Sequence, residues 1–589
     1  MEMIIGGKRM VLYRCEKDNL EQLHTSVCPH CQERTYAYRC DLYWCKTCQV
    51  PTYNETCGRC GQRGKRIASD MRPVFPEEKI LLEAILQQQN ETEENVDLEN
   101  VSVWNSTGNR YYGNGKRILV AIGALNQLDI EAIRVYYKKK LEQFCTAYYN
   151  AFEEMKVRFV EANKERFRQM DQDAISYIRE IGEKYDKKEM LVSFSGGKDS
   201  TVVSDLVDRA LGSATEKIVH IFGDTTLEFP TTYEYVKRYK KEHYKTPLIP
   251  ARNRDKDFYE LCKLVGPPSR VMRWCCTVFK TGAITRQIEK MFRHKRHIVT
   301  FYGIRRSESA SRSKYEKESD SPKISKQTVI SPIIDWFDFD VWLYILTRNI
   351  DFNEAYRWGY TRIGCWCCPN NSIWSEFLCR LHMEEKYTSF HELLVSFAVQ
   401  IGKSDPEEYV DSGNWKARQG GNGVPMAKKS IISFTPCVTE ENAFNYNLQR
   451  PITEEFYELF KPFGYLNFDL GNKRLGEVFV LSKKGEVLFK LQGRLGSKNL
   501  KVTIYQAAFG GARGLKAVEE KIKCQLTKYQ MCMGCLACEG VCKMDAITIR
   551  EKEDTVQYSI SDEKCVRCGH CINHFIAGCY MRKVLAIKR

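Results

Sequence analysis

No run of apolar residues in this sequence approaches about 18 positions, so we expect no transmembrane helix. The first ten residues have neither an apolar core nor a small-residue cleavage site, and they predict no signal peptide. Together these absences argue against a membrane protein and predict that the chain stays in the cytoplasm.

The length of 589 residues exceeds what one compact core holds, and it predicts about three to five domains. An apolar fraction of 43% and an aromatic fraction of 12% exclude wholesale disorder and fibrous folds. The 90 basic residues outnumber the 75 acidic ones by 15, which favours anionic partners such as nucleotides, nucleic acid or acidic redox proteins.

Cysteine is abundant: there are 26, most of them in Cys-x-x-Cys pairs. Secreted disulfide scaffolds are short, whereas this chain is long and shows no leader. In a reducing compartment this spacing predicts metal sites rather than disulfides.

A regular alternation of strands and helices marks the middle of the chain. Strands are predicted at residues 189–194, 217–222, 298–303 and 329–334, with helical stretches after the first two of them. This alternation predicts a parallel sheet with covering helices. Before it, residues 129–185 carry apolar residues at helical spacing without proline and predict two or three long helices.

The strand at 189–194 leads into Ser-Gly-Gly-Lys-Asp-Ser, residues 195–200. Two glycines let the backbone approach an anion, and the following helix offers free N–H groups and the positive end of its dipole. The serine hydroxyls and Lys198 add donors and charge. The loop lacks the Walker A pattern and the Gly-x-Gly-x-x-Gly pattern. From these residues alone, a Gly-Gly turn with a purely structural role remains the alternative interpretation.

Ser-Gly-Gly-Lys-Asp-Ser resembles the PP-loop of the ATP pyrophosphatase superfamily. Residues 221–233, 303–312 and 332–342 resemble motifs of the phosphoadenosine phosphosulfate (PAPS) reductase family. The resemblance implies an α/β fold, the PP-loop or adenine nucleotide alpha hydrolase-like type, with a parallel sheet, helices on both faces and a nucleotide at the carboxyl edge. It implies nucleotide binding by Ser195, Gly196, Gly197, Lys198, Asp199, Ser200, Asp224, Arg305 and Arg312.

Three residues are candidates for catalytic roles: Lys198, Arg305 and Lys280, which follows Cys276 by four positions. The guanidinium fork of Arg305 suits an anionic group of the substrate. For the neighbouring Arg306 we favour a surface salt bridge.

Cys275-Cys276, followed by the cysteines at 365–368, resembles the cluster-binding pattern of adenylylsulfate (APS) reductases. The resemblance implies one 4Fe–4S cluster held by Cys275, Cys276, Cys365 and Cys368. Cys367 leaves the choice between 367 and 368 open, and buried structural thiols are the alternative. The sequence departs from assimilatory reductases in one respect, since it has no Glu-Cys-Gly-like tail to supply a catalytic thiol.

The C-terminal cysteines follow bacterial ferredoxin spacing, in which the fourth cysteine of each run ligates the other cluster. One 4Fe–4S cluster is therefore predicted on Cys532, Cys535, Cys538 and Cys579. A second is predicted on Cys565, Cys568, Cys571 and Cys542. A zinc module is the alternative, although it would not need eight thiols in this order.

Two N-terminal knuckles predict a structural zinc ribbon on Cys45, Cys48, Cys57 and Cys60. Whether Cys15, Cys28, Cys31 and Cys40 form a second zinc site is left undecided by the sequence, with His24 or His30 as competing ligands.

The sequence predicts five parts in this order: a zinc-binding ribbon region (1–69), a connecting region with long helices (70–186), a PP-loop domain of PAPS reductase type (187–395), a small sheet-containing domain (396–520) and a two-cluster ferredoxin-type α+β domain (521–589). This arrangement resembles multidomain PAPS-reductase-like proteins of archaea and anaerobes.

The first functional hypothesis is an iron–sulfur oxidoreductase that reduces the sulfuryl group of APS or PAPS to sulfite. An external low-potential donor would supply electrons through the C-terminal clusters. The alternative is an ATP pyrophosphatase that transfers sulfur to tRNA or DNA, which the charge of +15 and the zinc ribbon fit. A third hypothesis, an electron-carrying or regulatory subunit with a degenerate loop, conflicts with the intact motif at 195–200. APS, PAPS and ATP all stay open as the bound nucleotide.

Overall fold

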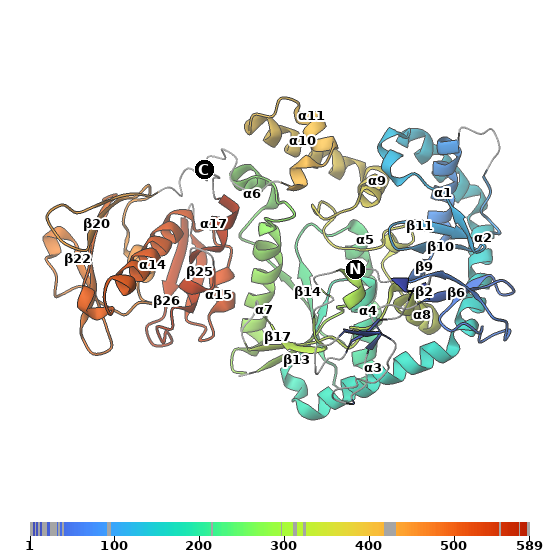
Figure 1. Cartoon of the computed structure of the whole chain (residues 1–589), viewed down its shortest axis with the longest axis horizontal. Helices are drawn as coiled ribbons and strands as arrows, with labels where there is room; N and C mark the ends of the chain where they lie inside the picture. Colours follow the sequence, from blue (N-terminus) through green and yellow to red (C-terminus); the bar gives the residue numbers. More distant parts are fainter. Residues whose placement is uncertain are drawn as a thin grey trace.

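A computed structural model of the chain (Figure 1) describes residues 4–5, 8–9, 12–14, 21–23, 32, 36–37, 41–90, 96–213, 216–295, 297–309, 312, 315–321, 326–417, 432–552, 555–575 and 578–585. Among these residues, no helix is both long enough and apolar enough to cross a membrane.

Small antiparallel sheets make up the N-terminal part. The pairings are β1 (Ile4–Ile5) with β2 (Lys8–Arg9), β3 (Leu12–Arg14) with β4 (Glu21–Leu23) and β5 (Tyr36–Ala37), and β6 (Leu42–Cys45) with β7 (Val50–Thr52) and β8 (Lys65–Ala68). A four-stranded sheet follows, in the order β12 (Lys116–Ile118), β11 (Arg110–Gly113), β10 (Val103–Ser106), β9 (Met71–Pro73).

The long helices predicted before the sheet are α2 (Ile130–Ala162) and α3 (Lys164–Lys184), and α1 (Pro76–Asn90) precedes them. Asp129 caps α2 by accepting hydrogen bonds from the N–H groups of Glu131 and Ala132. The break between α2 and α3 falls at Asn163. Its side chain accepts from the N–H of Tyr53 at 2.9 Å and donates to the carbonyl of Pro51 at 3.0 Å, so a contact from the N-terminal region fixes the break.

The central sheet has the strand order β15-β14-β13-β16-β18-β17. Its first five strands are parallel and β17 runs antiparallel. The strands are β13 (Met190–Phe194), β14 (Val219–Asp224), β15 (Leu248–Arg252), β16 (Ile298–Phe301), β17 (Glu318–Asp320) and β18 (Gln327–Ile330). The chain leaves β13 toward β14 on one side and later returns to β16 on the other, which creates a crevice at the carboxyl edge.

Helices cover both faces of this sheet. Val192 and Val299 pack with α3, with α4 (Lys198–Leu211) and with α8 (Asp338–Arg348). Leu191 and Ile221 pack on the opposite face with α7 (Gly282–Phe292). The predicted α/β class with a parallel sheet is thereby confirmed, and the near-continuous apolar run of β13 reflects burial on both faces.

The remaining helices are α5 (Pro230–Glu242), α6 (Phe258–Val265), α9 (Ile373–His382), α10 (Glu384–Gln400), α11 (Pro406–Asp411), α13 (Glu454–Glu458), α14 (Ala512–Met531), α15 (Ala537–Val541), α16 (His570–Asn573) and α17 (Tyr580–Leu585). In Figure 1, α10 and α11 lie at the top, while α14 lies beside the C-terminal hairpin.

An antiparallel sheet fills the region for which a small sheet is predicted. Its order is β19 (Ser433–Pro436), β20 (Ala443–Asn447), β24 (Asn499–Ile504), β23 (Val487–Gln492), β22 (Glu477–Leu481), β21 (Tyr465–Asn467). The hairpin of β25 (Ile547–Lys552) and β26 (Thr555–Ile560) follows α14 and α15. Figure 1 shows the hairpin and α15 between this outer sheet and α7.

Candidate active site and metal centres

The predicted phosphate loop connects β13 to α4 at the carboxyl edge of the sheet. Gly196 has a φ of +69°, a left-handed conformation that favours glycine. A Cβ at this position would lie only 2.9 Å from Cγ2 of Thr232. Gly197 is the last residue before α4, whose first N–H groups and positive dipole end favour an anion.

Hydroxyl groups hold the loop in shape. The N–H of Ser195 donates to Oγ of Ser200 at 3.1 Å, and that hydroxyl donates to the carbonyl of Gly197 at 2.8 Å. The N–H of Lys198 donates to the phenol oxygen of Tyr356 at 3.0 Å. The loop is therefore ordered by the protein itself, and Tyr356 is a contributor that no sequence motif indicated.

Lys198 and Arg305 share two carboxylates. Arg305 donates from Nε to Asp199 at 2.5 Å and from Nη2 to Asp338 at 2.7 Å. Nζ of Lys198 lies 3.3 Å from Asp338 and 3.6 Å from Asp199. Burial alone would lower the pKa of Lys198, but the two carboxylates outweigh it and raise that pKa, so Lys198 stays charged.

Asp70 joins this cluster from the N-terminal part of the chain. It accepts hydrogen bonds from the N–H groups of Asp338 and Phe339 at the start of α8, both at 3.0 Å. Burial, followed by the nearby charge of Asp338, raises the pKa of Asp70 to about 7. Lys198, Asp199, Arg305, Asp338 and Asp70 line a cavity of about 280 Å³.

Two further arginines follow β16. Arg312 forms an ion pair with Glu308. Arg306 is buried, pairs with Asp335 and donates from Nε to the carbonyl of Tyr315 at 3.0 Å. Our interpretation of Arg306 as a surface salt bridge is therefore wrong. Its N–H donates to the carbonyl of Ile334 at 2.8 Å, which holds this turn against the interior.

The loop after β14 carries Asp224 to the same sheet edge. Asp224 accepts from the phenol of Tyr233 at 2.8 Å and from the N–H of Thr226 at 2.9 Å. Oγ1 of the intervening Thr225 lies 3.5 Å from Sγ of Cys365. The predicted nucleotide loop and the predicted cluster cysteines are thus in direct contact.

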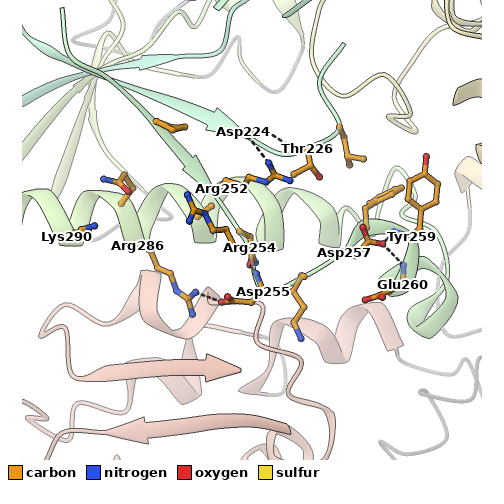
Figure 2. A pocket seen from close by; sticks show the side chains of 17 residues that line it. Asp224, Thr226, Arg252, Arg254, Asp255, Asp257, Tyr259, Glu260, Arg286 and Lys290 are labelled. Atoms are coloured by element: carbon orange, nitrogen blue, oxygen red, sulfur yellow. Dashed lines mark hydrogen bonds and ion pairs between the residues drawn. The ribbon is translucent and has the colours of Figure 1, made fainter. Parts of the chain in front are cut away.

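A cavity of about 1,100 Å³ opens beside Asp224 (Figure 2). Its walls come from the ends of β14 and β15, from α6 and from α7. Figure 2 shows Arg286 reaching from α7 toward Asp255, and the bond between them is 2.9 Å long. The C-terminal hairpin borders the cavity, since Nη2 of Arg286 also donates to the carbonyl of Ile549 at 2.5 Å.

The cleft cysteines come together from two segments. Cys275 immediately precedes the π-helical turn η3 (Cys276–Thr281). Burial raises the pKa of the Cys365 thiol, and Glu228, Cys368 and Cys276 add to the rise. Lys280 is exposed, and its charge acts on the carboxyl group of Glu228.

Cys367 and Cys368 have different neighbours. Burial raises the pKa of both thiols. Cys367 lies near Cys365 and Cys262 and also acts on Cys275, whereas Cys368 lies near Cys276 and the cations Arg362 and Arg273. Cys368 is the member of the pair beside Cys276, and its assignment as the ligand stays a prediction.

The C-terminal cysteines separate into two groups. In the inner group, Cys535 faces Cys579, Cys538 and Cys532. In the outer group, Cys571 lies near Cys538 of the inner group as well as near Cys542 and Cys565, and Cys568 is exposed. The crossed assignment predicted from ferredoxin spacing stays a prediction. The buried ammonium of Lys528 lies near both groups and donates to the carbonyl of Cys571 at 3.0 Å.

The predicted zinc ligands Cys45, Cys48, Cys57 and Cys60 lie with their sulfur atoms within 4.8 Å of one another. A hydrogen bond from the backbone N–H of Gln62 is the main cause that lowers the pKa of Cys60 to about 7, which favours a thiolate. This set could hold a metal ion. The cysteines and histidines of the open second site, at 15, 24, 28, 30, 31 and 40, lie outside the described residues.

Comparison with known proteins adds a family match. Residues 189–371 match the model of the phosphoadenosine phosphosulfate reductase domain. An uncharacterized protein of Methanocaldococcus jannaschii is 32% identical over 260 residues, which cover 44% of this chain and 60% of the relative. The chain therefore spans less than two thirds of that protein.

An adenosine 5′-phosphosulfate reductase of Anoxybacillus flavithermus is 30% identical over 187 residues, which cover 31% of this chain and 72% of the relative. Among solved structures, the phosphoadenylyl-sulfate reductase of Candida auris in a phosphate complex aligns with a TM-score of 0.25 at 18% identity, over 33% of this chain and 95% of that one.

Proposed function

This chain belongs to the phosphoadenosine phosphosulfate reductase family, and on that basis we propose that it is an iron–sulfur reductase of adenylylated sulfate. The substrate is APS or PAPS. The reaction breaks the bond between sulfur and the bridging phosphate oxygen. Two electrons pass to sulfur, which leaves as sulfite. The bridging oxygen stays on the phosphate of the released nucleotide, which can take up a proton.

One observation carries the proposal, namely the 3.5 Å contact between Thr225 and Cys365. Thr225 belongs to the loop that follows the predicted nucleotide residue Asp224, and Cys365 belongs to the cleft cysteines. The contact supports a site in which the sulfuryl group of a nucleotide bound at the sheet edge lies beside the cysteine group.

The chain's own residues bind and orient the nucleotide in this proposal. The N–H groups at the start of α4 and the ammonium of Lys198 hold the phosphate end. Arg305 is fixed by Asp199, by Asp338 and by Ser307, to which Nη1 donates at 3.1 Å, and the second N–H of Nη1 would bind the nucleotide. Lys280 neutralises charge on the sulfuryl side, where it acts on Glu228.

The cysteine groups fit the metals predicted for them, because thiolates are the ligands of iron–sulfur clusters and of structural zinc. The clusters would be held by Cys275, Cys276, Cys365 and Cys368, by Cys532, Cys535, Cys538 and Cys579, and by Cys542, Cys565, Cys568 and Cys571. Bound clusters supply one-electron transfer. Zinc on Cys45, Cys48, Cys57 and Cys60 would stabilise the N-terminal ribbon.

A binding titration tests the nucleotide part of the proposal. The anaerobically purified chain is titrated with APS, PAPS and ATP, and competition identifies the preferred nucleotide. We expect APS or PAPS to bind more tightly than ATP, and Lys198→Ala to weaken that binding. A preference for ATP, together with retained nucleic acid, would replace the reductase with a sulfur-transfer enzyme.

A further inference from the structure

The segment that carries the inner group of C-terminal cysteines packs against the segment that carries Cys275 and Cys276. Leu536 follows Cys535 and rests on Gly282, the first residue of α7, which follows η3. A Cβ at Gly282 would lie 2.9 Å from Cβ of Leu536, so the two segments are as close as glycine allows. Cys275, Cys535 and Cys579 are buried in one apolar cluster.

Tyr580 connects the two groups of cysteines. It follows Cys579 of the inner group, and its hydroxyl donates to the carbonyl of Arg273 at 3.4 Å. It also forms a hydrogen bond with the side chain of Thr277 in η3. The phenol lies within electrostatic reach of Cys276 and of Cys535, one from each group. The Tyr580 side chain thus contacts the segment that carries the cleft cysteines, and the residue before it, Cys579, belongs to the inner group.

Polar contacts one turn further along α7, and at Lys326 before β18, hold the same interface. Arg286 bonds the carbonyl of Ile549 and lies 3.5 Å from Glu539. Lys326 forms an ion pair of 2.6 Å with Asp545. The C-terminal hairpin is therefore held on the parallel-sheet region from two directions, which favours one fixed orientation.

The outer group differs from the inner one in exposure. Cys568 is exposed, whereas Cys535 and Cys579 are buried. A soluble electron donor would therefore reach the outer group at the exposed Cys568.

We propose that Tyr580 is a positioning residue that holds the inner cysteine group beside the cleft cysteines for internal electron transfer. The inference rests on the proposed function. Clusters held by the inner cysteines and by the cleft cysteines would pass on single electrons from an external low-potential donor, and two electrons would convert the sulfuryl sulfur to sulfite.

Paramagnetic resonance of the full chain, purified anaerobically and reduced with dithionite, tests this inference. Two reduced clusters that lie close together broaden or split each other's signals, and this coupling does not depend on substrate or turnover. The variants are Tyr580→Phe, Tyr580→Ala and Gly282→Ala. The controls are Tyr244→Ala and Gly123→Ala, because Tyr244 is 77% exposed and a Cβ at Gly123 meets nothing within 4 Å.

We expect loss of the coupling in Tyr580→Ala and in Gly282→Ala at unchanged iron content, with both controls like wild type. Gly282→Ala touches no cysteine, so it keeps the test valid if Tyr580→Ala disturbs the neighbouring Cys579. Tyr580→Phe keeps the ring but loses the hydroxyl contacts with Arg273 and Thr277, and it should reduce the coupling less than Tyr580→Ala does. Unchanged coupling in Tyr580→Ala would overturn the role of Tyr580. Wild-type protein that binds no iron would instead overturn the proposed function, and this inference with it.

Discussion

Oγ1 of Thr225 lies 3.5 Å from Sγ of Cys365. The two residues are 140 positions apart, yet they join the loop after β14 to the cleft cysteines. The same Thr225 hydroxyl donates to Glu228 at 2.7 Å, which keeps the loop in place. Binding of a nucleotide at the sheet edge and chemistry at the cysteines are therefore parts of one site in the proposed enzyme.

Replacing Cys368 and Cys367 separately should give different iron contents. Cys368→Ser should remove about four iron atoms per chain, because Cys368 faces Cys276 across the cleft. Cys367→Ser should retain them, because Cys367 lies toward Cys262. Iron and acid-labile sulfide are measured on anaerobic protein. Equal losses in the two variants would contradict the assignment.

Gly196→Ala should weaken nucleotide binding while leaving the sheet folded. An alanine in the left-handed conformation costs roughly 1–3 kcal/mol, and its Cβ would meet Thr232. We expect about tenfold weaker binding of APS or PAPS by titration. Gly123→Ala is the matched control, since a Cβ there meets nothing. An unchanged affinity would show that the loop does not bind the nucleotide.

Arg305→Ala should destabilise the chain as well as impair binding. Removing the guanidinium leaves Lys198 as the cation that Asp199 and Asp338 still share, and breaking a buried pair costs about 3–5 kcal/mol. The urea midpoint of the transition reports the change. Arg63→Ala breaks a pair with Glu55 in which Arg63 is 78% exposed, and it should hardly move the urea midpoint, because solvent screens an exposed pair. Similar shifts in both variants would contradict the burial argument.

His220 should make stability depend on pH. Burial lowers its pKa from 6.5 to about 4, so the folded state binds fewer protons than the unfolded state between these values. Its contribution is fully present above about pH 6.5 and is lost as the pH falls toward 4, with a total of about 3 kcal/mol. His220→Gln should flatten this part of the stability curve, measured by denaturation between pH 7 and 4.5.

The exposed His294 provides the control for that curve. His294→Gln should leave the slope as in wild type. An equal slope in wild type and His220→Gln would assign the acid sensitivity to other groups.

Local patterns predicted much of the fold. The apolar run of β13 and the Gly-Gly turn after it indicated a strand, a loop and a helix, and the structure has all three. Helical spacing predicted the long helices, but their break at Asn163 depends on Tyr53 and Pro51, which are more than 100 positions away. Spacing within a helix carries no information about such a partner.

The surroundings of Lys198 and Arg305 could not be predicted for the same reason. Asp338 lies within the family match at residues 189–371 and Asp70 lies far before it, and the two meet at the start of α8. A single arginine in a sequence does not show whether its side chain is buried, and Arg306 is an example, since the structure buries it beside Asp335. The division into five domains and the functional roles of the site residues stay predictions.

Sulfite release is the most direct test of the proposal that this protein reduces APS or PAPS. The anaerobic protein receives a low-potential reductant and either APS or PAPS, and free sulfite is measured over time. The account predicts sulfite from one of the two nucleotides, with loss of release in Cys368→Ser. No sulfite from protein with a full iron content would contradict the reductase assignment.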